Sequence, residues 1–411
     1  MSEIFVVGVG MTPFGKMLDR SVKDLTRQAV EVAMSDASTS ADSIGSLFFS
    51  NSTQSIMEGQ HMIPGQIALR ELGFQRKPIF NVENACAGGT SAFHLAYVDL
   101  LAGQCDVALA VGVEKMVHTD KALSLSIFDG AWDVATRDET FEILSALGQD
   151  MAIPEPYENA TGNRSVFMDM YASIARHHMA KFGLTQRQIA IVAAKNHQHS
   201  IQNPFAQYQN AVSVEEVLSS RVIAWPLTLP MCAPVSDGAA AVILCRKEAL
   251  HKFDRSRAIR IDASVIGGGT DRDPRDTSKH IGRLAAIEAY ERAGMEPSDM
   301  HLAEVHDASA FAEILQTENL GFCDIGEGGR LAESGATTIG GRIPVNPSGG
   351  LISRGHPISA TGLAQIHELV MQLREEAGPR QVDGARVAIA ENGGGFYKYE
   401  EAVAAITILS R

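Results

Sequence analysis

The sequence predicts a layered α/β fold built from two similar halves. Short apolar strands alternate with alanine-rich helices, the elements of the first half recur in the second, and 411 residues exceed one ordinary core. In the first half a helix over 21–35 leads to a strand over 46–50; in the second a helix over 281–293 leads to a strand over 302–306. We expect the halves to pack face to face with their sheets buried.

The repeat continues with a second helix and strand in each half. A polar, basic stretch over 252–257 separates the halves, so we expect an N-terminal half over 1–255 and a C-terminal half over 256–411. The further predicted elements are helix 88–101 with strand 107–113, helix 360–373 with strand 385–390, and a strand over 258–266 that opens the second half.

The segment 117–210 has no counterpart in the second half. It holds Pro154-Glu155-Pro156, several Met and Tyr residues, and paired histidines. An insertion of this length at the edge of a sheet usually shapes a pocket. We therefore expect an inserted cap or loop domain over the functional site.

Composition excludes several classes of protein. A net charge of −14 argues against binding to nucleic acids and to anionic membrane surfaces. Five cysteines without CxxC spacing are typical of free thiols in a reducing compartment. The chain enters a strand at once without a signal peptide, and no apolar run is long enough to span a bilayer. We expect a cytoplasmic enzyme or enzyme subunit.

Two pairs of histidines invite a reading as metal ligands. His177-His178 and His197-x-His199 have no nearby set of carboxylates or thiols, so surface or helix-packing histidines are the better interpretation. We expect no metal in this chain.

The chemistry centres on Cys86 and His356. Cys86 lies where the strand-like run before Asn84–Ser91 gives way to a helix, and we expect the helix N-terminus to lower the pKa of its thiol. His356, in Gly355–Gly362, precedes the matching helix of the second half. Pseudo-twofold packing would bring the thiol and the imidazole to one site, as an activated nucleophile requires.

Five segments carry a family resemblance, in this order along the chain: Val7–Gly15, Asn84–Ser91, Val235–Ala241, Val305–Asp307 and Asn346–Gly362. They resemble the thiolase superfamily, and the chain is most similar to the sterol-carrier-protein-type (lipid-transfer-protein) thiolases and their bacterial relatives. The resemblance implies a five-layer αβαβα fold, acyl-CoA and coenzyme A as substrates, and a homodimer or higher oligomer.

The resemblance also implies roles for individual residues. Cys86 would take up the acyl group, His356 would deprotonate it, and His306 would help to stabilise the oxyanion. Backbone N–H groups of Cys86 and of the C-terminal glycine loop would complete the oxyanion site. Glycine lets a ligand approach the backbone closely. The glycines expected to contact CoA are Gly349, Gly350, Gly393 and Gly394.

The chain departs from the thiolase pattern at the second cysteine, which normally acts as an acid–base group. The two expected positions read Glu391-Asn392-Gly393 and His306-Asp307-Ala308, and Cys323 lies beyond the intervening helix. Three explanations stay open, and we rank the first highest. Glu391 carries the proton, or Cys86 acts with the two histidines as in ketosynthases, or catalysis is impaired and the chain serves a partner.

The sequence thus predicts an acyl-CoA C-acyltransferase that cleaves or forms a bulky, branched or aromatic 3-oxoacyl-CoA, as benzoylsuccinyl-CoA-type thiolases do. One alternative is a thiolase-like subunit that needs a small zinc-ribbon/OB-fold partner; another is a C-acylating synthase with a non-CoA acceptor. Lys181 and Arg187 are candidates for binding the diphosphate end of CoA. Ser359 lies near the start of a predicted helix, where serine suits a cap. The remaining thiols are expected to be incidental: Cys105, Cys232 and Cys245.

Overall fold

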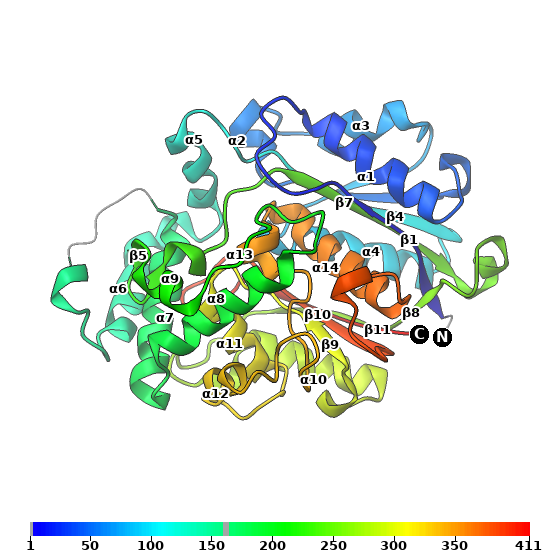
Figure 1. The fold of residues 1–411 in the computed structure, drawn as a ribbon. Helices are drawn as coiled ribbons and strands as arrows, with labels where there is room; N and C mark the ends of the chain where they lie inside the picture. Colours follow the sequence, from blue (N-terminus) through cyan, green and yellow to red (C-terminus); the bar gives the residue numbers. More distant parts are fainter. Residues whose placement is uncertain (1–2, 159–163) are drawn as a thin grey trace.

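The computed structural model describes residues 3–158 and 164–411, so residues 159–163 of the predicted insertion lie outside the described residues. Within the described residues, nine strands form one mixed sheet in the order β3-β2-β4-β7-β1-β8-β11-β10-β9. Helices cover both faces of each half of this sheet, and the two chain ends lie side by side (Figure 1).

The sheet consists of two halves with matching strand orders. From its outer edge inwards, the first half has the strand order β3-β2-β4-β7-β1. The second half has the order β9-β10-β11-β8, and the β-bridge from Val345 to Ala303 of β9 takes the place of the outermost strand. Within the described residues, the two halves of the sheet are joined by the strand pairs Phe5–Arg260 and Val6–Ile259 of β1 and β8. This topology confirms the predicted duplication. The predicted boundary at 252–257 falls between β7 and β8.

Helices α4 and α14 form the middle layer, between the two halves of the sheet (Figure 1). Both are apolar around most of their circumference because both sides face protein. All residues of α14 except Met371 are buried. The outer layers are α1 with α3 on one side and α10 on the other. The five layers αβαβα are therefore those that the sequence predicted.

The N-terminal half begins with two strands joined by an amphipathic helix. Ser21 caps that helix through a reciprocal hydrogen-bonded box with Asp24, which explains why the helix begins at Val22. The elements are β1 (Ile4–Met11), α1 (Val22–Asp36), β2 (Ser46–Ser50), α2 (Gln54–Glu58), α3 (Pro64–Leu69), β3 (Ile79–Val82), α4 (Gly88–Leu101), β4 (Val107–Glu114) and β7 (Gly238–Arg246).

The C-terminal half repeats this plan with shorter connections. Its strand β9 ends at Glu304, two residues before the predicted end, and β10 continues through Gly393 and Gly394, which were expected to form a loop. The elements are β8 (Ile259–Gly268), α10 (Ile281–Ala293), β9 (Leu302–Glu304), α11 (Ala310–Asn319), α12 (Gly328–Glu333), α13 (Gly350–Arg354), α14 (Ile358–Leu373), β10 (Val387–Gly394) and β11 (Val403–Ser410).

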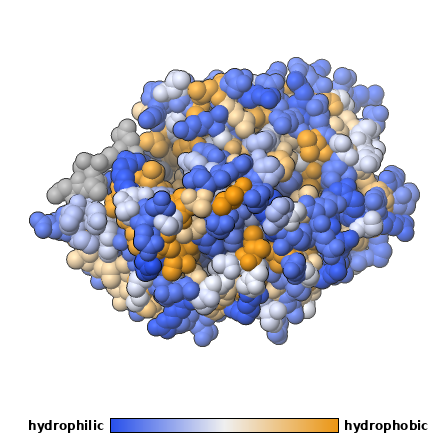
Figure 2. All heavy atoms as spheres, in the orientation of Figure 1, coloured by the Kyte–Doolittle hydropathy of each residue, from blue (hydrophilic) through white to orange (hydrophobic). Residues whose placement is uncertain are grey.

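The insertion between β4 and β7 is largely helical. Its helices α7 and α8 share an apolar core with α11 and α13 of the second half, so the insertion links the two halves. The face in Figure 2 is mostly hydrophilic, with hydrophobic residues gathered over these helices. The elements are α5 (Lys121–Ser126), α6 (Arg137–Gly148), α7 (Val166–Phe182), α8 (Gln186–Ser200), α9 (Val214–Ser219), β5 (Val222–Ala224) and β6 (Leu227–Thr228).

No helix in the described residues is long and apolar enough to cross a membrane.

Glycines allow the backbone of α14 to lie directly against the backbone of α4 and β4. A Cβ atom at Gly89 would lie 2.2 Å from the carbonyl oxygen of Ser359, and one at Gly112 would lie 2.0 Å from the same atom. A Cβ at Gly362 would lie 1.8 Å from Oγ1 of Thr90. Each of these distances is shorter than any van der Waals contact, so only glycine fits. The N-termini of α4 and α14 therefore lie next to each other.

We expect Gly112→Ala to destabilise the protein by about 1–3 kcal/mol, as overpacking of a core does. The added Cβ would meet backbone rather than a mobile side chain, so α14 must shift away from β4. Thermal unfolding followed by circular dichroism measures the effect.

Gly268→Ala is the matched control, since Gly268 also lies in a strand and its Cβ would meet nothing within 4 Å. Equal melting temperatures for the two variants would contradict the close packing described above.

Candidate active site

Cys86 lies in a tight turn between β3 and α4. The turn Ala85–Ala87 is a single 3₁₀ turn, and Ala85 adopts a left-handed conformation with φ of 47°. The carboxylate of Glu83 accepts the Ala85 N–H at 2.6 Å, which stabilises this strained backbone. The side chain of Cys86 projects from this turn into a cavity.

His356 is held from both of its sides. Its backbone N–H donates to Oγ of Ser236 at 3.0 Å, and its Nδ1 lies 2.7 Å from Oγ1 of Thr361. The Thr361 hydroxyl donates its only proton to the carbonyl of Pro357, at 3.0 Å. Its oxygen must therefore accept a hydrogen bond from the Nδ1–H group of His356. This leaves Nε2 of His356 with a free lone pair, as a base requires.

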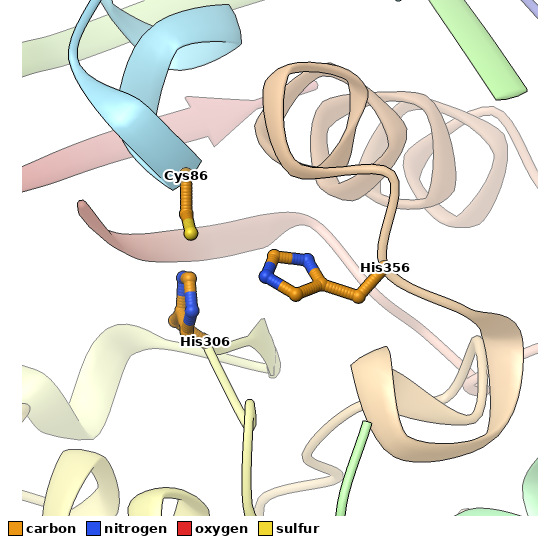
Figure 3. A group of neighbouring side chains, drawn as sticks. All are labelled: Cys86, His306 and His356. Atoms are coloured by element: carbon orange, nitrogen blue, oxygen red, sulfur yellow. The ribbon is translucent and has the colours of Figure 1, made fainter. Parts of the chain in front are cut away.

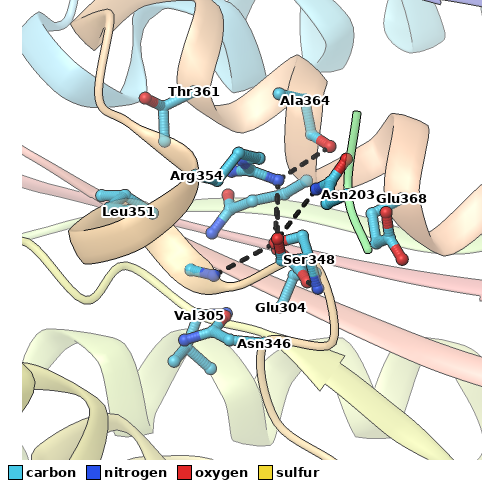
Figure 4. A network of polar contacts seen from close by, with 12 residues as sticks. Asn203, Glu304, Val305, Asn346, Ser348, Leu351, Arg354, Thr361, Ala364 and Glu368 are labelled. Carbon is cyan, nitrogen blue, oxygen red and sulfur yellow. Dashed lines mark hydrogen bonds and ion pairs between the residues drawn. The ribbon is translucent and has the colours of Figure 1, made fainter. Parts of the chain in front are cut away.

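The loop before His356 is anchored by a buried arginine. Nη1 of Arg354 donates to Oε2 of Glu304, Oγ of Ser348 and the carbonyl of Ala364, each at 3.2 Å (Figure 4). Glu304 also accepts the backbone N–H of Ser348 at 3.0 Å. Because Glu304 ends β9 and Ala364 lies in α14, this network fixes the loop to the C-terminal half of the sheet.

His306 follows the end of β9 and has the opposite tautomer. Its Nδ1 lies 2.9 Å from Nδ2 of Asn392, an amide nitrogen that can only donate. Asn392 is itself oriented by Thr90, whose hydroxyl donates to Oδ1 at 2.8 Å. The ring proton of His306 therefore sits on Nε2, where it can be donated to a substrate oxygen.

The three side chains converge on one point. The sulfur of Cys86 and the ring nitrogens nearest to it on His306 and His356 all lie within 4.8 Å of one another. The two imidazole rings are 5.2 Å apart and nearly perpendicular, at 82°. Figure 3 shows the thiol pointing towards both rings, each from a different element. Residues from both halves thus meet at one site, as the duplication predicted.

The thiol of Cys86 is not a preformed thiolate, and the prediction of a lowered pKa was wrong. Burial, with smaller contributions from the carboxylates of Glu114 and Glu83, raises the pKa of Cys86 from 9.0 to about 12. A hydrogen bond from the N–H of Gly395 acts in the other direction without outweighing burial. The backbone N–H groups of Gly395 and Cys86 are thus a weaker influence on this pKa than loss of solvent. A base must remove the proton during the reaction.

Both histidines are neutral at neutral pH. Burial lowers the pKa of His306 to about 4, and burial together with His306 and Arg354 lowers the pKa of His356 well below its ordinary value. One neutral ring offers a lone pair and the other offers an N–H group. The site can therefore take a proton from a thiol and stabilise a developing oxyanion at the same time.

Backbone N–H groups near the thiol come from two segments. The N–H of Gly395 donates towards Cys86, and the N–H of Cys86 itself also stabilises the sulfur. The turn at Gly395 is fixed because the next N–H, that of Phe396, donates to the carbonyl of Ala131 at 2.8 Å. The glycine loop thus places Gly395, rather than Gly394, at the thiol.

The four glycines predicted to contact CoA lie in different surroundings. Gly393 lines the cavity, whereas Gly349 and Gly350 lie outside the cavity wall that the described residues form. A Cβ at Gly349 would meet Ser200 at 2.4 Å, and one at Gly350 would meet Asp307 at 2.2 Å. Close packing thus accounts for these two glycines.

Gly394 packs directly behind the nucleophile turn. A Cβ there would lie 2.3 Å from the carbonyl oxygen of Asn84 and 2.6 Å from Cβ of Ala87. Contact of any of the four glycines with CoA stays a prediction.

Glu391 is fully buried behind His306. Its Oε2 accepts the backbone N–H of His306 at 2.9 Å, and its Oε1 has no hydrogen-bond partner among the described residues. Burial and the neighbouring Glu401 raise the pKa of Glu391 to about 8. It lies outside the described part of the cavity wall, so its role as proton carrier stays a prediction.

The sequence suggested that Ser359 caps its helix, but it does not. The N-cap of α14 is Pro357, and Oγ of Ser359 donates instead to Oε1 of Glu114 at 2.5 Å. Burial raises the pKa of Glu114 to about 7, against hydrogen bonds from Ser359 and from the backbone of Ser52 and Thr53. Glu114 ends β4, so this buried carboxyl ties α14 to the N-terminal half.

The thiol and imidazoles open into a mainly apolar cavity of about 500 Å³. Its arginines are Arg164 and Arg221, whereas Lys181 donates to the carbonyl of Arg275 and Arg187 pairs with Glu215. The apolar part of the wall comes mainly from the insertion: Leu125, Ile127, Phe128, Phe167, Met168, Tyr171, Val212, Ile223 and Leu229.

Sequence reasoning missed several residues of the site. Thr361 and Asn392 lie inside recognised segments, and their ability to orient a histidine could have been suspected from that position. Cys232, interpreted as incidental, lines the cavity. Tyr171 and Glu401 also line the cavity, and no motif marks either of them.

Among the described residues, Cys86, His306 and His356 also form a cluster whose sulfur and nitrogen atoms are close enough to hold a metal ion. Thiolate and imidazole are ligands that Zn²⁺ accepts. The tautomers described above instead suit proton transfer, since Nε2 of His306 carries a proton.

Comparison with known proteins identifies both halves. Residues 4–248 match the N-terminal domain of thiolase, and residues 272–411 match the thiolase C-terminal domain-like family. An acetyl-CoA acetyltransferase of Methanothermobacter thermautotrophicus is 38% identical over 413 residues, covering 100% of both chains. The benzoylsuccinyl-CoA thiolase subunit BbsB of Thauera aromatica is 35% identical, covering 96% of this chain and 95% of the relative.

The chain is also similar to a sterol carrier protein and, in its fold, to two solved structures. Bovine sterol carrier protein 2 is 36% identical over 96% of this chain and 70% of its own length. The Ltp2-ChsH2(DUF35) aldolase has a TM-score of 0.78 at 22% identity, covering 99% and 97% of the two chains. Human mitochondrial 3-ketoacyl-CoA thiolase in complex with CoA has a TM-score of 0.71 at 20% identity, covering 100% and 98%.

We expect the alkylation of Cys86 by iodoacetamide to accelerate with pH throughout the range from neutral to above 9. The thiolate is the reactive form, and a pKa raised to about 12 means that its fraction still grows where an ordinary thiol has levelled off. Peptide mass spectrometry separates Cys86 from the other thiols. A rate that is already maximal near neutral pH would show a preformed thiolate and contradict this assignment.

Proposed function

This chain belongs to the thiolase family and is an acyltransferase of that family, and we propose that it transfers acyl groups through a thioester on Cys86. One observation carries the proposal: a neutral thiol lies within 4.8 Å of a lone pair on His356 and a ring N–H on His306. This set can activate a nucleophile and stabilise an oxyanion without any change of charge before the substrate arrives.

The first half of the reaction follows from these positions. Nε2 of His356 takes the proton of Cys86 as the sulfur attacks the substrate carbonyl carbon. The ring N–H of His306 and the backbone N–H groups of Cys86 and Gly395 stabilise the negative oxygen that forms. When the carbonyl re-forms, the leaving group departs, and for a CoA thiolate His356 returns the proton. Cys86 then carries the acyl group.

We propose that the arginines on the cavity wall bind the anionic end of CoA. Arg164 and Arg221 lie on the same wall as Cys86. Arg221 is exposed and can meet a phosphate group, and Arg164, which pairs with Asp169 at 2.8 Å, adds a second guanidinium to this wall. The apolar remainder of the cavity suits the acyl chain. Its volume of about 500 Å³ supports a bulky, branched or aromatic 3-oxoacyl group rather than a small acyl group alone.

Glu391 supports this site from behind. We propose that its carboxyl group positions His306 through the backbone N–H and remains protonated at neutral pH, because burial raises its pKa to about 8. The set of Cys86, His306 and His356 also supports carbon–carbon chemistry of the ketosynthase kind, including acyl transfer to a non-CoA acceptor.

A second candidate is a subunit that is active only with a partner. Two comparisons favour it: the relative BbsB is named as a thiolase subunit, and the structural neighbour is named as the Ltp2-ChsH2(DUF35) aldolase. We also propose that the chain forms homodimers. Strand β3 lies at the outer edge of the sheet with Phe80 48% exposed, so a second copy could cover it.

Incubation with a panel of 3-oxoacyl-CoA thioesters should leave an acyl group on Cys86, visible by intact-protein mass spectrometry. The adduct should disappear in Cys86→Ala, and Cys232→Ala is the matched control because its thiol lines the same cavity. Aromatic or branched acyl groups should give more adduct than acetoacetyl-CoA. The absence of an adduct with every thioester would contradict the proposal.

Activity of the purified chain separates the two candidates. If the chain is a self-sufficient thiolase, it should release acyl-CoA from a 3-oxoacyl-CoA and CoA on its own, at a rate that a co-expressed small zinc-ribbon/OB-fold protein does not change. Turnover that occurs only with such a partner would instead establish the second candidate.

A further inference from the structure

One glutamate lines the active-site cavity and has no role in the acylation steps. Glu401 lies on the cavity wall with Cys86, His306 and His356, although only 5% of its surface is exposed. It comes from the segment between β10 and β11, where no motif drew attention to it. Gly393 makes room for it, because a Cβ there would lie 2.7 Å from Cγ of Glu401.

The carboxylate of Glu401 is held in place by two side chains from the opposite direction. Its Oε2 lies 3.2 Å from Nε2 of His280, and its Oε1 accepts from Gln316 at 3.5 Å. His280 caps α10, and its Nδ1 accepts the N–H of Gly282 at 3.1 Å. The ring proton of His280 is therefore on Nε2 and points at Glu401. Burial acts to raise the pKa of Glu401, but the electrostatic attraction of His280 and this hydrogen bond outweigh burial and lower the pKa to about 2, so the carboxylate is ionised.

A separate, small and mainly apolar cavity of about 20 Å³ adjoins Glu401. Glu401 and Tyr171 belong to the walls of both cavities, and the small one is also lined by His177. Nε2 of His177 is buried without a hydrogen-bond partner among the described residues, while Nδ1 lies 2.6 Å from a carboxylate oxygen of Asp150. A space of this size holds one water molecule.

Thiolase chemistry needs such a group, and both expected positions of the second thiol lack one. Carbon–carbon bond formation removes a proton from the carbon next to a thioester carbonyl. Glu391 lies outside the described cavity wall, whereas Glu401 faces the cavity from beside His306. We propose that Glu401 is the acid–base residue that exchanges a proton with this α-carbon; the assignment rests on the proposed function.

In the direction of condensation, the carboxylate of Glu401 takes a proton from the α-carbon of the second acyl-CoA. The C–H electron pair forms a bond to the carbonyl carbon of the acyl group on Cys86. The carbon–sulfur bond breaks, and the Cys86 thiolate leaves. The proton on Glu401 returns through solvent to the thiol–histidine pair. Cleavage runs the same steps in reverse.

Hydrogen exchange at the α-carbon tests this assignment directly. Acetyl-CoA is incubated with the protein in D₂O, and deuterium in its methyl group is followed by NMR, with acylation of Cys86 measured in parallel. We expect Glu401→Gln to acylate Cys86 as the wild type does, but to lose α-carbon exchange by about 100-fold or more, the usual contribution of general acid–base catalysis.

Glu318→Gln is the matched control. Glu318 is also a buried glutamate bonded to a histidine ring, with Oε1 3.0 Å from Nε2 of His178, yet it lies outside the described walls of both cavities. It should exchange at the wild-type rate. Glu401→Asp should retain more exchange than Glu401→Gln. Added formate should restore part of the exchange in Glu401→Ala, which a purely structural role does not predict.

The outcomes separate this assignment from the proposed function. A wild-type protein that never acylates Cys86 contradicts the proposed function, and the assignment with it. Normal acylation together with normal exchange in Glu401→Gln overturns the assignment alone. If Glu401→Gln fails to acylate, the formate experiment decides: exchange in Glu401→Ala that formate leaves unchanged overturns the assignment, and restored exchange supports it.

Discussion

The site depends on the contact between the N-termini of α4 and α14. Neither half of the chain contains a complete set of reactive groups, since Cys86 precedes one helix and His356 precedes the other. They meet because Gly89 and Gly112 let the carbonyl of Ser359 approach to backbone distance. A side chain at either glycine would collide with this carbonyl and push α14 away.

Burial, rather than the helix dipole, sets the electrostatics of this site. The resting thiol is protonated and both imidazoles are neutral, because the surrounding protein disfavours every charged form. The two rings nevertheless differ, since Thr361 accepts a hydrogen bond from His356 while Asn392 donates one to His306. One ring is thereby a base and the other a donor. Neutral groups with fixed tautomers cost little to bury, yet they can stabilise charge once it develops.

The sequence was sufficient to predict the layered fold, the duplication and most helices, because apolar periodicity and helix caps are local signals. It also predicted which thiol and imidazole would meet, since the duplication relates their positions. It misjudged the pKa of Cys86, because burial arises from residues far along the chain. Glu401 escaped notice for a similar reason: its place beside His306 follows from the packing of the β10–β11 segment, which no short motif records.

The central claim is that glycine contacts between α4 and α14 bring the thiol and both imidazoles into one reactive group. A crystal structure of the wild-type protein with CoA tests this claim most directly. We expect the sulfur of Cys86 and the ring nitrogens of His306 and His356 within 4.8 Å of one another, with Ser359 against Gly89 and Gly112. A structure in which α14 stands away from α4, with His356 out of reach of Cys86, would contradict the account.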